Sequence, residues 1–436
     1  MVQAFLISAP RSGEGKTLLT LGFLRLFKKR GLKVQPFKVG PDFIDPKWHQ
    51  FSCGSLSYNL DLFSMGERRL KALFYEKTKH SNVAIVEGVM GLFDGKYSSF
   101  NIAKLLKIPV VLVVDAFGIS ESIKYLVKGF SEKIKKANLT FSIFLNRVSS
   151  ERHLLRLEKA LKGYNILGIL FRNKDLELPS RHLGLYLPED FTKAEEVLEK
   201  LVADLEKTVN FSLLKEYKIE NFEALPRETF LPPIPYKTIA IAYDNAFNFY
   251  YNHLLEELKE RARVLYFSPL KNEEIPPEAE AVFIGGGYPE LWADDLSDNK
   301  KTLKSIKNWV EEGLPLYAEC GGLIYLSKEL FFGEKIYKFS QIFPFSIKKE
   351  KLTLGYRIVK PLQEIPFFET KAPFLAHEFH YTNLTYTLEA ERFKKIRRIF
   401  QVKPFEGNKF SKSFKEGFLY KRCLATYMHL LSFYNV

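Results

Sequence analysis

A glycine-rich stretch near the start of the chain has the composition of a phosphate-binding loop. Residues 10–17 read Pro-Arg-Ser-Gly-Glu-Gly-Lys-Thr and lie between an apolar segment and an amphipathic one. Gly13 and Gly15 would let backbone N–H groups approach phosphate oxygens, and the start of the following helix would add its positive end. Lys16 would reach the β- and γ-phosphates of ATP, and Thr17 would coordinate Mg²⁺. The stretch therefore predicts an ATP-binding loop.

Two positions of this loop are unusual. Pro10 replaces the first glycine of the G-x-x-x-x-G-K-T pattern, and Arg11 stands where one subclass of such loops carries an extra lysine. Whether Arg11 contacts phosphate stays open. A tight glycine turn without nucleotide is the alternative, and the agreement of strand, loop, Lys-Thr pair and helix argues against it.

Acidic side chains follow several predicted strands and would serve the metal ion and the phosphoryl transfer. Bound Mg²⁺ needs oxygen ligands to offset its charge. Glu87 ends the apolar run 83–86, and the glycines after it would leave room for a ligand. Asp42, Asp45 and Asp94 lie in similar loops, where a solvated acid or a helix cap is the alternative for any one of them. We predict metal ligation by Thr17, Asp42 and Glu87.

A cysteine at the end of an apolar strand is the second reactive group. Residues 317–323 read Tyr-Ala-Glu-Cys-Gly-Gly-Leu, so Cys320 would occupy a nucleophile elbow before the helix 323–330. Such a turn exposes the thiol at a helix N-terminus and lowers its pKa. A small core residue is the usual role of a free cysteine, and Cys53 and Cys423, which lack this setting, keep that interpretation.

A triple glycine could complete the cysteine site. Residues 285–290 read Gly-Gly-Gly-Tyr-Pro-Glu after another apolar run, and this loop resembles the oxyanion-hole loop of class I glutamine amidotransferases. The backbone amides of Gly286 and Gly287 would stabilise the tetrahedral intermediate that forms when the thiol attacks the amide of glutamine. A plain glycine turn is the alternative.

The base that such a cysteine needs must be a histidine. His429 matches the class I chain order of cysteine before histidine, although Leu431 stands where an acid usually follows, which implies a dyad. His377 and His380 are rivals, and their spacing also allows a metal site. We expect these two near the substrate or within the fold.

Alternating apolar and amphipathic segments in the first half predict the sheet that positions the phosphate loop. This β-α-β rhythm predicts a mostly parallel sheet covered by helices. The predicted strands are 4–8, 33–38, 83–87, 110–115 and 140–146, and the predicted helices are 16–29 and 194–207.

A proline-rich segment, 216–235, separates this half from a second α/β rhythm. The second half has predicted strands at 238–243, 263–267, 281–284 and 315–319, and a predicted helix at 250–261. From about residue 331 the chain is aromatic and β-rich, and the order of its strands is not predicted. We therefore expect two α/β domains, at 1–210 and 237–436, joined by a linker at 211–236.

Several longer blocks together resemble the a,c-diamide synthases of corrinoid biosynthesis. The resemblance is collinear from residue 4 to about 432, and one position, Phe43, departs from the usual tyrosine. The blocks are Phe37–Pro46, Asn59–Asp61, Glu87–Gly95, Arg181–Leu185 and His377–Tyr381.

The resemblance implies an α/β fold with two domains. The first is a P-loop parallel-sheet domain similar to dethiobiotin synthetase, and the second is a class I glutamine amidotransferase-like domain. The first would use ATP to phosphorylate a substrate carboxylate, with Lys38 neutralising developing charge. Asn146 would read adenine, with a simple strand-end turn as the alternative. Ammonia released by Cys320 and His429 would pass inside the protein to the acyl phosphate.

The implied substrate is cobyrinic acid, amidated at its a and c side chains during cobalamin biosynthesis. Hydrogenobyrinic acid and a nickel-sirohydrochlorin are alternative tetrapyrroles. An alternative function from a different class of protein is a P-loop partition or metal-insertion ATPase. This function would explain the first half of the chain but gives no role to Cys320 or His429. The implied partners are the tetrapyrrole, L-glutamine and ATP, and a homodimer is compatible with the sequence.

The net charge of +14 does not decide between these functions. Basic residues stand beside acidic ones, as in 256–263, so a solvated surface, a polyanionic substrate and a nucleic acid would all be compatible with them. We expect no nucleic-acid partner and no membrane, because no apolar run reaches the roughly 18 residues of a spanning helix. With three cysteines and no pattern of a secretory signal, a cytoplasmic enzyme is expected.

Overall fold

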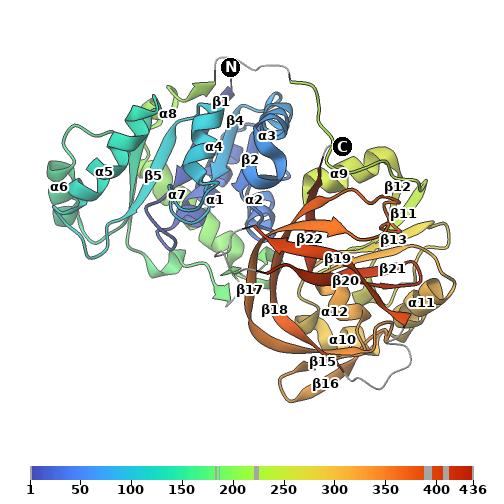
Figure 1. Ribbon diagram of the computed structural model, residues 1–436. Coiled ribbons are helices and arrows are strands. Elements are labelled where there is room, and N and C mark those ends of the chain that lie inside the picture. Colours follow the sequence, from blue (N-terminus) through green and yellow to red (C-terminus); the bar gives the residue numbers. More distant parts are fainter. Residues whose placement is uncertain are drawn as a thin grey trace. The chain divides into compact units, whose positions relative to one another are not determined.

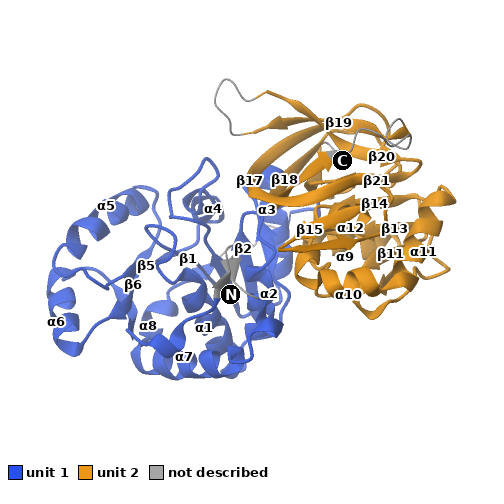
Figure 2. Ribbon diagram, turned by 90° about the horizontal axis from the view of Figure 1, so that it is seen from below, with its two compact units in different colours: residues 1–228 blue, residues 229–436 orange. Residues whose placement is uncertain are grey.

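A computed structural model describes residues 2–181, 184–185, 187–219, 225–386, 395–405 and 412–434 of the chain (Figure 1). The chain forms two compact units: unit 1 is residues 1–228 and unit 2 is residues 229–436 (Figure 2). Both units are α/β, as predicted. One of the sequence blocks named above, Arg181–Leu185, lies partly outside the described residues.

A parallel sheet forms the centre of unit 1, and the strand β10 (Lys218–Ile219) adds to it antiparallel to β1. Long apolar strands suit such a sheet because helices cover both faces. The spatial order is β3 (Tyr58–Leu60), β2 (Val34–Val39), β4 (Val83–Glu87), β1 (Val2–Ser8), β5 (Val110–Asp115), β6 (Phe141–Val148) and β7 (Ile166–Phe171).

Helices of unit 1 follow most of these strands. They are α1 (Lys16–Lys29), α2 (Asp45–Cys53), α3 (Leu62–Thr78), α4 (Ser99–Leu106), α5 (Ile123–Lys136), α6 (Glu151–Ala160), α7 (Ala194–Thr208) and α8 (Phe211–Leu214). A small hairpin, β8 (Ser180–Arg181) with β9 (Gly184–Leu185), precedes α7. Short 3₁₀ turns lie at Lys174–Leu176 and Pro188–Asp190. The segment expected to be a linker includes α8 and β10, which belong to unit 1.

The sheet of unit 2 begins with five parallel strands and continues as antiparallel structure, apart from a parallel pairing of β15 with β17. The parallel part is β12 (Arg263–Phe267), β11 (Thr238–Ala242), β13 (Ala281–Ile284), β14 (Leu316–Glu319) and β21 (Cys423–Thr426). The rest is β20 (Phe414–Tyr420), β19 (Arg397–Pro404), β17 (Phe345–Pro361), β15 (Glu329–Phe332) and β16 (Lys335–Lys338).

Two further strands complete unit 2. The long strand β18 (Phe374–Tyr386) pairs with both β17 and β22 (Met428–Phe433), and β17 and β18 curve together in Figure 1. The helices are α9 (Asn252–Arg261), α10 (Ala293–Asp298), α11 (Lys300–Glu311) and α12 (Gly321–Leu326), with 3₁₀ turns at Pro269–Lys271 and Pro289–Trp292. The predicted helix 323–330 was wrong at its end, because Ser327 adopts an extended backbone and β15 begins at Glu329.

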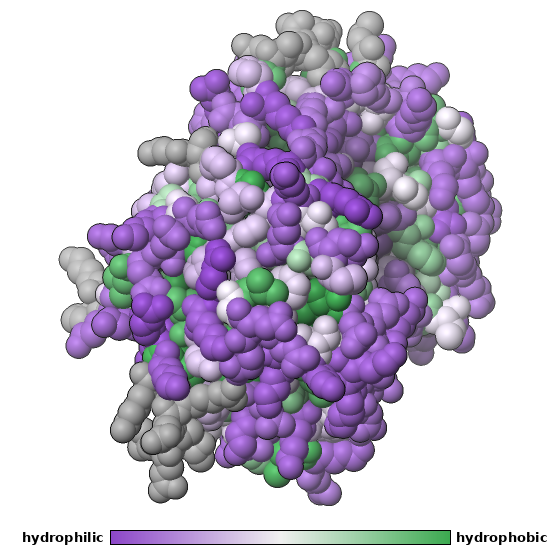
Figure 3. All heavy atoms as spheres, turned by 90° about the vertical axis from the view of Figure 1, so that its right-hand side faces the viewer, coloured by the Kyte–Doolittle hydropathy of each residue, from purple (hydrophilic) through white to green (hydrophobic). Residues whose placement is uncertain are grey.

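The surface mixes both signs of charge. Hydrophilic side chains cover most of the face drawn in Figure 3, with hydrophobic ones in smaller groups between them. Exposed pairs such as Lys421 with Glu311 and Lys335 with Asp294 illustrate the mixture. No helix among the described residues combines the length and the apolar character needed to cross a bilayer.

A buried arginine links three helices behind the phosphate loop. The Nε atom of Arg25 donates to the carbonyl of Ser52 at 2.7 Å, and its guanidinium also reaches the carbonyl of Phe51 at 3.2 Å and Glu195 at 2.7 Å. These partners lie on or beside α2 and on α7, whereas Arg25 lies on α1. The arginine therefore holds the loop-bearing helix against its two neighbours.

We predict that Arg25→Met lowers the free energy of unfolding of unit 1 by about 2 kcal/mol, because two carbonyls lose their donor. The half-exposed pair with Glu195 should add little. Chemical denaturation measures the difference, with Arg152→Met on exposed α6 as the control. Equal loss in both variants would contradict the assignment.

Candidate functional site

The phosphate loop lines a cavity of about 570 Å³ in unit 1. The loop connects β1 to α1, and Lys16, which starts α1, donates from Nζ to the carbonyl of Arg11 at 3.1 Å. Burial and the nearby Lys38 lower the pKa of Lys16, so the lysine is poised to gain an anionic partner. Arg11 itself is exposed and pairs with Glu14 at 2.7 Å.

Asn146 closes the loop from the end of β6. Its Nδ2 atom donates to the carbonyl of Glu14 at 2.9 Å, and a Cβ on Gly15 would fall 2.3 Å from that same nitrogen. Gly15 also has a φ of 97°, which favours glycine. Asn146 lines the cavity together with Phe117, which is stacked by the guanidinium of Arg172 at 4.3 Å from its ring centre. This end of the cavity offers a flat aromatic face and an amide.

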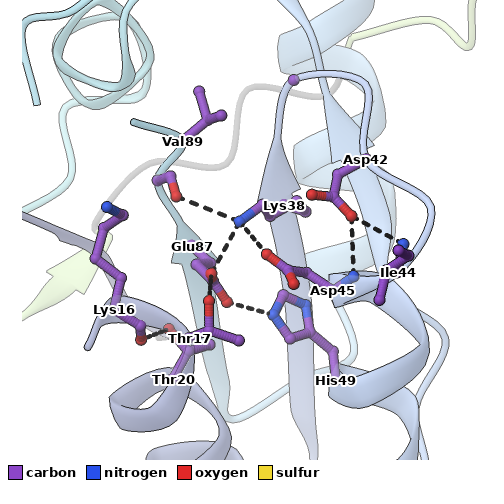
Figure 4. A network of polar contacts seen from close by, with 12 residues as sticks. Lys16, Thr17, Thr20, Lys38, Asp42, Ile44, Asp45, His49, Glu87 and Val89 are labelled. Atoms are coloured by element: carbon purple, nitrogen blue, oxygen red, sulfur yellow. Dashed lines mark hydrogen bonds and ion pairs between the residues drawn. The ribbon is translucent and has the colours of Figure 1, made fainter. Parts of the chain in front are cut away.

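A buried ion network occupies the carboxyl ends of β2 and β4 (Figure 4). Lys38 Nζ lies 2.8 Å from Glu87 Oε1 and also binds Asp45 and the carbonyl of Gly88. Burial alone would lower the pKa of Lys38, but the two carboxylates outweigh it and raise that pKa. Glu87 has no exposed surface, and the cations beside it hold its pKa below the usual range against the effect of burial. Lys38 and Glu87 are therefore both charged, whereas burial and the charge of Asp42 raise the pKa of Asp45.

His49 is a member of this network that the sequence analysis missed. It lies on α2 with no exposed surface, its Nε2 is 2.7 Å from Glu87 Oε2, and its Nδ1 is 2.9 Å from the Ser57 hydroxyl. Figure 4 shows its ring beside Glu87, on the side away from Lys16. His49 lies three residues after the block Phe37–Pro46. Nothing in the sequence indicated that this single histidine would pair with Glu87.

The other predicted carboxylates have different places. Asp42 Oδ1 accepts from the backbone amides of Ile44 and Asp45 at 2.8 and 2.9 Å, so it organises the start of α2. Asp94 Oδ2 accepts from the amide of Gly91 at 2.8 Å and shapes the loop after β4. Asp45 alone of these three contacts Lys38 in the described part of the chain.

The residues beside the loop fit a magnesium ion. Thr17 Oγ1 and Glu87 Oε1 lie 2.6 Å apart, close enough for both oxygens to join one coordination sphere. Magnesium at a nucleotide site uses only one or two carboxylates, with phosphates and water as the other ligands. Among the described residues no group of three or more His, Cys, Asp or Glu side chains is arranged to hold a metal ion.

Cys320 lies at the sharp turn between β14 and α12, where the elbow was expected. Its φ of 46° is rare for a residue with a side chain, and its amide donates to the carbonyl of Thr426 at 2.7 Å. The predicted lowering of its pKa was wrong. The thiol is 5% exposed, and burial followed by the charges of Glu290 and Glu319 raises its pKa.

The triple glycine packs directly against the elbow. A Cβ on Gly321 would fall 2.9 Å from the amide nitrogen of Gly287, and a Cβ on Gly286 would fall 2.4 Å from Cε1 of His429. Gly287 has a φ of 155°, and a Cβ there would meet the carbonyl of Ala246 at 2.0 Å. The loop, the cysteine turn and His429 are thus brought together, and only glycine permits the approach.

His429 lies on β22 and is 1% exposed. Its Nδ1 is 3.7 Å from Oε2 of Glu319, the residue before the cysteine, whose other oxygen accepts from the amide of Leu430 at 3.0 Å. In the sequence, Leu431 stands two residues after His429, where an acid usually follows, so no acid was predicted for this histidine. The carboxylate comes instead from β14.

The two other histidines of β18 differ from each other. His377 is paired in register with His429, and burial followed by the charge of His429 lowers the pKa of His377 to about 3, so its ring is neutral. His380 is bonded to Glu378 at 3.0 Å and to the carbonyl of Thr382 at 2.7 Å, and stacks on Tyr427. One therefore lies beside the cysteine site and the other within a polar network of the fold.

Both units of the chain match known protein families. Residues 5–185 match the CobQ/CobB/MinD/ParA nucleotide binding domain, and residues 238–435 match the CobB/CobQ-like glutamine amidotransferase domain. A cobyrinate a,c-diamide synthase of Caldanaerobacter subterraneus subsp. tengcongensis is 37% identical over 99% of this chain and 95% of that protein. One from Saccharolobus solfataricus is 38% identical, covering 91% and 92%. A hydrogenobyrinate a,c-diamide synthase of Brucella abortus biovar 1 is 37% identical over 99% of both chains.

The chain belongs to the a,c-diamide synthase family. The expected two-part architecture and the resemblance stated from the sequence blocks are confirmed. A partition ATPase would account for the nucleotide-binding part alone, whereas this glutamine-dependent ligase family accounts for both. The roles of single residues in the two sites stay predictions.

A buried carboxyl group lies next to the amidotransferase site. Glu416 on β20 accepts from the Thr426 hydroxyl at 2.5 Å and from the amide of Tyr427 at 2.9 Å. Burial raises the pKa of Glu416 to about 7 despite these hydrogen bonds, and the charge of Glu378 adds to the rise. Glu416 lines a cavity of about 400 Å³ with Glu378, Tyr427 and neighbouring residues.

We predict that His49→Ala lowers the free energy of unfolding by about 1–3 kcal/mol, since a buried Glu87 oxygen loses its partner. Ammonia-driven amidation should fall as well, because Glu87 would no longer be fixed beside Thr17. The exposed His80→Ala in the same unit is the control. Wild-type stability and turnover in His49→Ala would contradict the role.

Glu416 generates a pH prediction. Its folded-state pKa lies above its unfolded value of 4.5, so the native state binds more protons and stability must fall as pH rises from 4.5 through about 7. Relative to Glu416→Gln, which stays neutral, wild type should lose roughly 3 kcal/mol across that window. Denaturant unfolding at several pH values measures the difference. A pH-independent difference would show that Glu416 does not titrate there.

Proposed function

We propose that this enzyme converts the a and c side-chain carboxylates of cobyrinic acid to primary amides, using ATP and ammonia released from glutamine. The observation that carries the proposal is the presence in one chain of a buried Lys38–Glu87 ion pair at a phosphate loop and a cysteine elbow packed on a glycine turn. Relatives that match the chain over almost its whole length are named cobyrinate a,c-diamide synthase. Amidation of the metal-free hydrogenobyrinic acid is the second candidate, because relatives of equal similarity are named for it.

In the N-terminal part, taken as residues 1–210, a substrate carboxylate oxygen attacks the γ-phosphorus of ATP. The new oxygen–phosphorus bond forms as the bond to the β-phosphate oxygen breaks, leaving ADP and an acyl phosphate. Gly13 and Gly15 give the loop its phosphate-facing amides, Lys16 binds the β- and γ-phosphates, and Asn146 contacts adenine.

The buried network serves the transferred group. Lys38, whose ammonium group is held by Asp45 and Glu87, would place a positive charge beside the acyl phosphate as it forms. Thr17 and Glu87, with Asp42 nearby, would hold Mg²⁺, which when bound withdraws charge from the phosphate oxygens. Asp94 keeps the loop after β4 in place.

In the C-terminal part, taken as residues 237–436, His429 removes the proton of the Cys320 thiol as sulfur attacks the amide carbon of glutamine. The oxyanion that forms is stabilised by the amides of Gly286 and Gly287. Collapse of the intermediate breaks the carbon–nitrogen bond, and the proton returns to the leaving ammonia. Water then hydrolyses the thioester to glutamate.

Ammonia attacks the acyl phosphate and expels inorganic phosphate, which completes one amide. The cycle runs once at each of the two side chains. A cytoplasmic location suits an enzyme whose three cysteines are all free and buried and whose substrates are ATP and glutamine. A homodimer and the absence of a nucleic-acid partner remain part of this proposal.

We predict that Cys320→Ser abolishes glutamine-driven amidation and glutamate release while ammonia-driven amidation persists, because the N-terminal part is untouched. Mass spectrometry of the macrocycle counts the amides, since each conversion replaces OH by NH₂. Cys423→Ser, at a buried cysteine outside the site, is the matched control and should keep both activities. Full glutamine-driven turnover in Cys320→Ser would refute the proposal.

The choice of macrocycle needs a separate comparison. Cobyrinic acid, hydrogenobyrinic acid and a nickel-sirohydrochlorin are each offered with ATP, Mg²⁺ and glutamine, and ADP formation is followed with product mass. The proposal expects the highest kcat/KM with cobyrinic acid and two amides formed. Greater efficiency with hydrogenobyrinic acid would select the second candidate.

A further inference from the structure

His429 of the amidotransferase site has an acidic partner, Glu319, on a different strand. The position of Glu319 in the sequence, directly before Cys320, does not indicate this pairing. Glu319 ends β14 and is 4% exposed, and its Oε2 lies 3.7 Å from Nδ1 of His429 on β22. A carboxylate held inside the protein needs such compensation, because burial disfavours an isolated charge. The pairing therefore differs from an ion pair on a solvated surface, which contributes little.

We propose that Glu319 is the positioning residue of His429, so that the site works as a triad whose acid precedes the nucleophile in the chain. The proposal rests on the proposed function and extends it. A carboxylate facing Nδ1 selects the imidazole tautomer that carries its proton there, which leaves Nε2 as the base. It also stabilises the imidazolium that forms when the thiol proton is taken up.

A backbone hydrogen bond fixes the carboxylate independently of the histidine. Glu319 Oε1 accepts from the amide of Leu430 at 3.0 Å, which is the residue after His429. One oxygen is thus anchored on β22 while the other faces the ring on the same strand. Strand pairing adds to this, because Glu319 lies opposite Thr426 in the parallel pairing of β14 with β21.

The distance of 3.7 Å exceeds that of a hydrogen bond, so in this state the carboxylate acts on the ring through its charge. A shortening of about 0.8 Å would produce an ordinary N–H···O contact. Such contacts often tighten only when substrate binds. Protonation of the ring supplies the attraction for that movement.

Three other residues near His429 in the described part of the chain do not offer this charge. His377 faces it from β18, but that ring is neutral and cannot stabilise an imidazolium. Gly286 faces it from the loop after β13 and has no side chain. Leu431 follows on β22 and is apolar. Glu319 is the carboxylate that the described ion pairs place at this ring.

The same carboxylate has an opposite effect on the thiol. Burial first, and then the charges of Glu290 and Glu319, raise the pKa of Cys320. A resting thiol that is kept protonated needs its base at the moment of attack, which makes the orientation of His429 more important. Removal of the Glu319 charge should therefore ease thiol ionisation while it impairs proton transfer.

The test uses Glu319→Gln, whose amide oxygen can still accept from Leu430 while its charge is gone. We expect kcat for glutamine hydrolysis to fall by at least about tenfold with little change in KM. Ammonia-driven amidation should stay at the wild-type rate, and alkylation of Cys320 by iodoacetamide should be as fast as in wild type or faster. Glu319→Asp, which keeps the charge at a shorter reach, should recover part of kcat.

Glu312→Gln is the matched control, since it makes the same change at an exposed position shortly before β14. Wild-type kcat in Glu319→Gln would overturn the proposal. So would an equal loss of ammonia-driven activity or slower alkylation, since either indicates structural damage. The Cys320→Ser result distinguishes failure of the triad proposal from failure of the proposed function. If that variant is inactive with glutamine and Glu319→Gln is not, only the triad fails; if Cys320→Ser stays active, the proposed function fails.

Discussion

A carboxylate with no exposed surface, Glu87 at the end of β4, imposes the arrangement of the nucleotide-binding unit. A buried charge is tolerated only when it is paired and hydrogen-bonded, and here Lys38, His49 and Thr17 satisfy both of its oxygens. These three residues come from β2, α2 and α1, so the ion network ties the elements around the phosphate loop to one another. The network that stabilises this edge of the sheet would also supply the cation and the oxygen ligands that we propose for phosphoryl transfer.

The amidotransferase unit also has a buried reactive group, the thiol of Cys320. Its predicted nucleophile, Cys320, is buried with a raised pKa, so its reactivity would have to come from a base and an oxyanion site that are already in place. The turn at Cys320, the bend at Gly287 and the strand that carries His429 meet because glycine allows contacts that a side chain would block. Both sites lie at the carboxyl ends of parallel strands, where loops from neighbouring strands converge.

Local sequence was sufficient for the parts of the fold that depend on local patterns. The strands ending at Glu87 and Asp115 were predicted to the residue, because apolar runs bounded by polar residues specify buried parallel strands. The pairings of β17, β18 and β22 were beyond reach, since they depend on contacts between distant segments. His49 and Glu319 were missed for the same reason: each gains its meaning from a partner at a remote position. The pKa of the Cys320 thiol was mispredicted because the elbow motif says nothing about the burial of the thiol or about the carboxylates near it.

The central claim is that ATP makes a carboxylate of the macrocycle reactive as an acyl phosphate before nitrogen arrives. The most direct measurement uses a macrocycle whose carboxylate oxygens carry the heavy oxygen isotope. After turnover with ATP and glutamine, the inorganic phosphate is analysed by phosphorus NMR or mass spectrometry. The account predicts a single labelled oxygen in the phosphate for each amide formed. Amide formation that leaves all the phosphate unlabelled would contradict it.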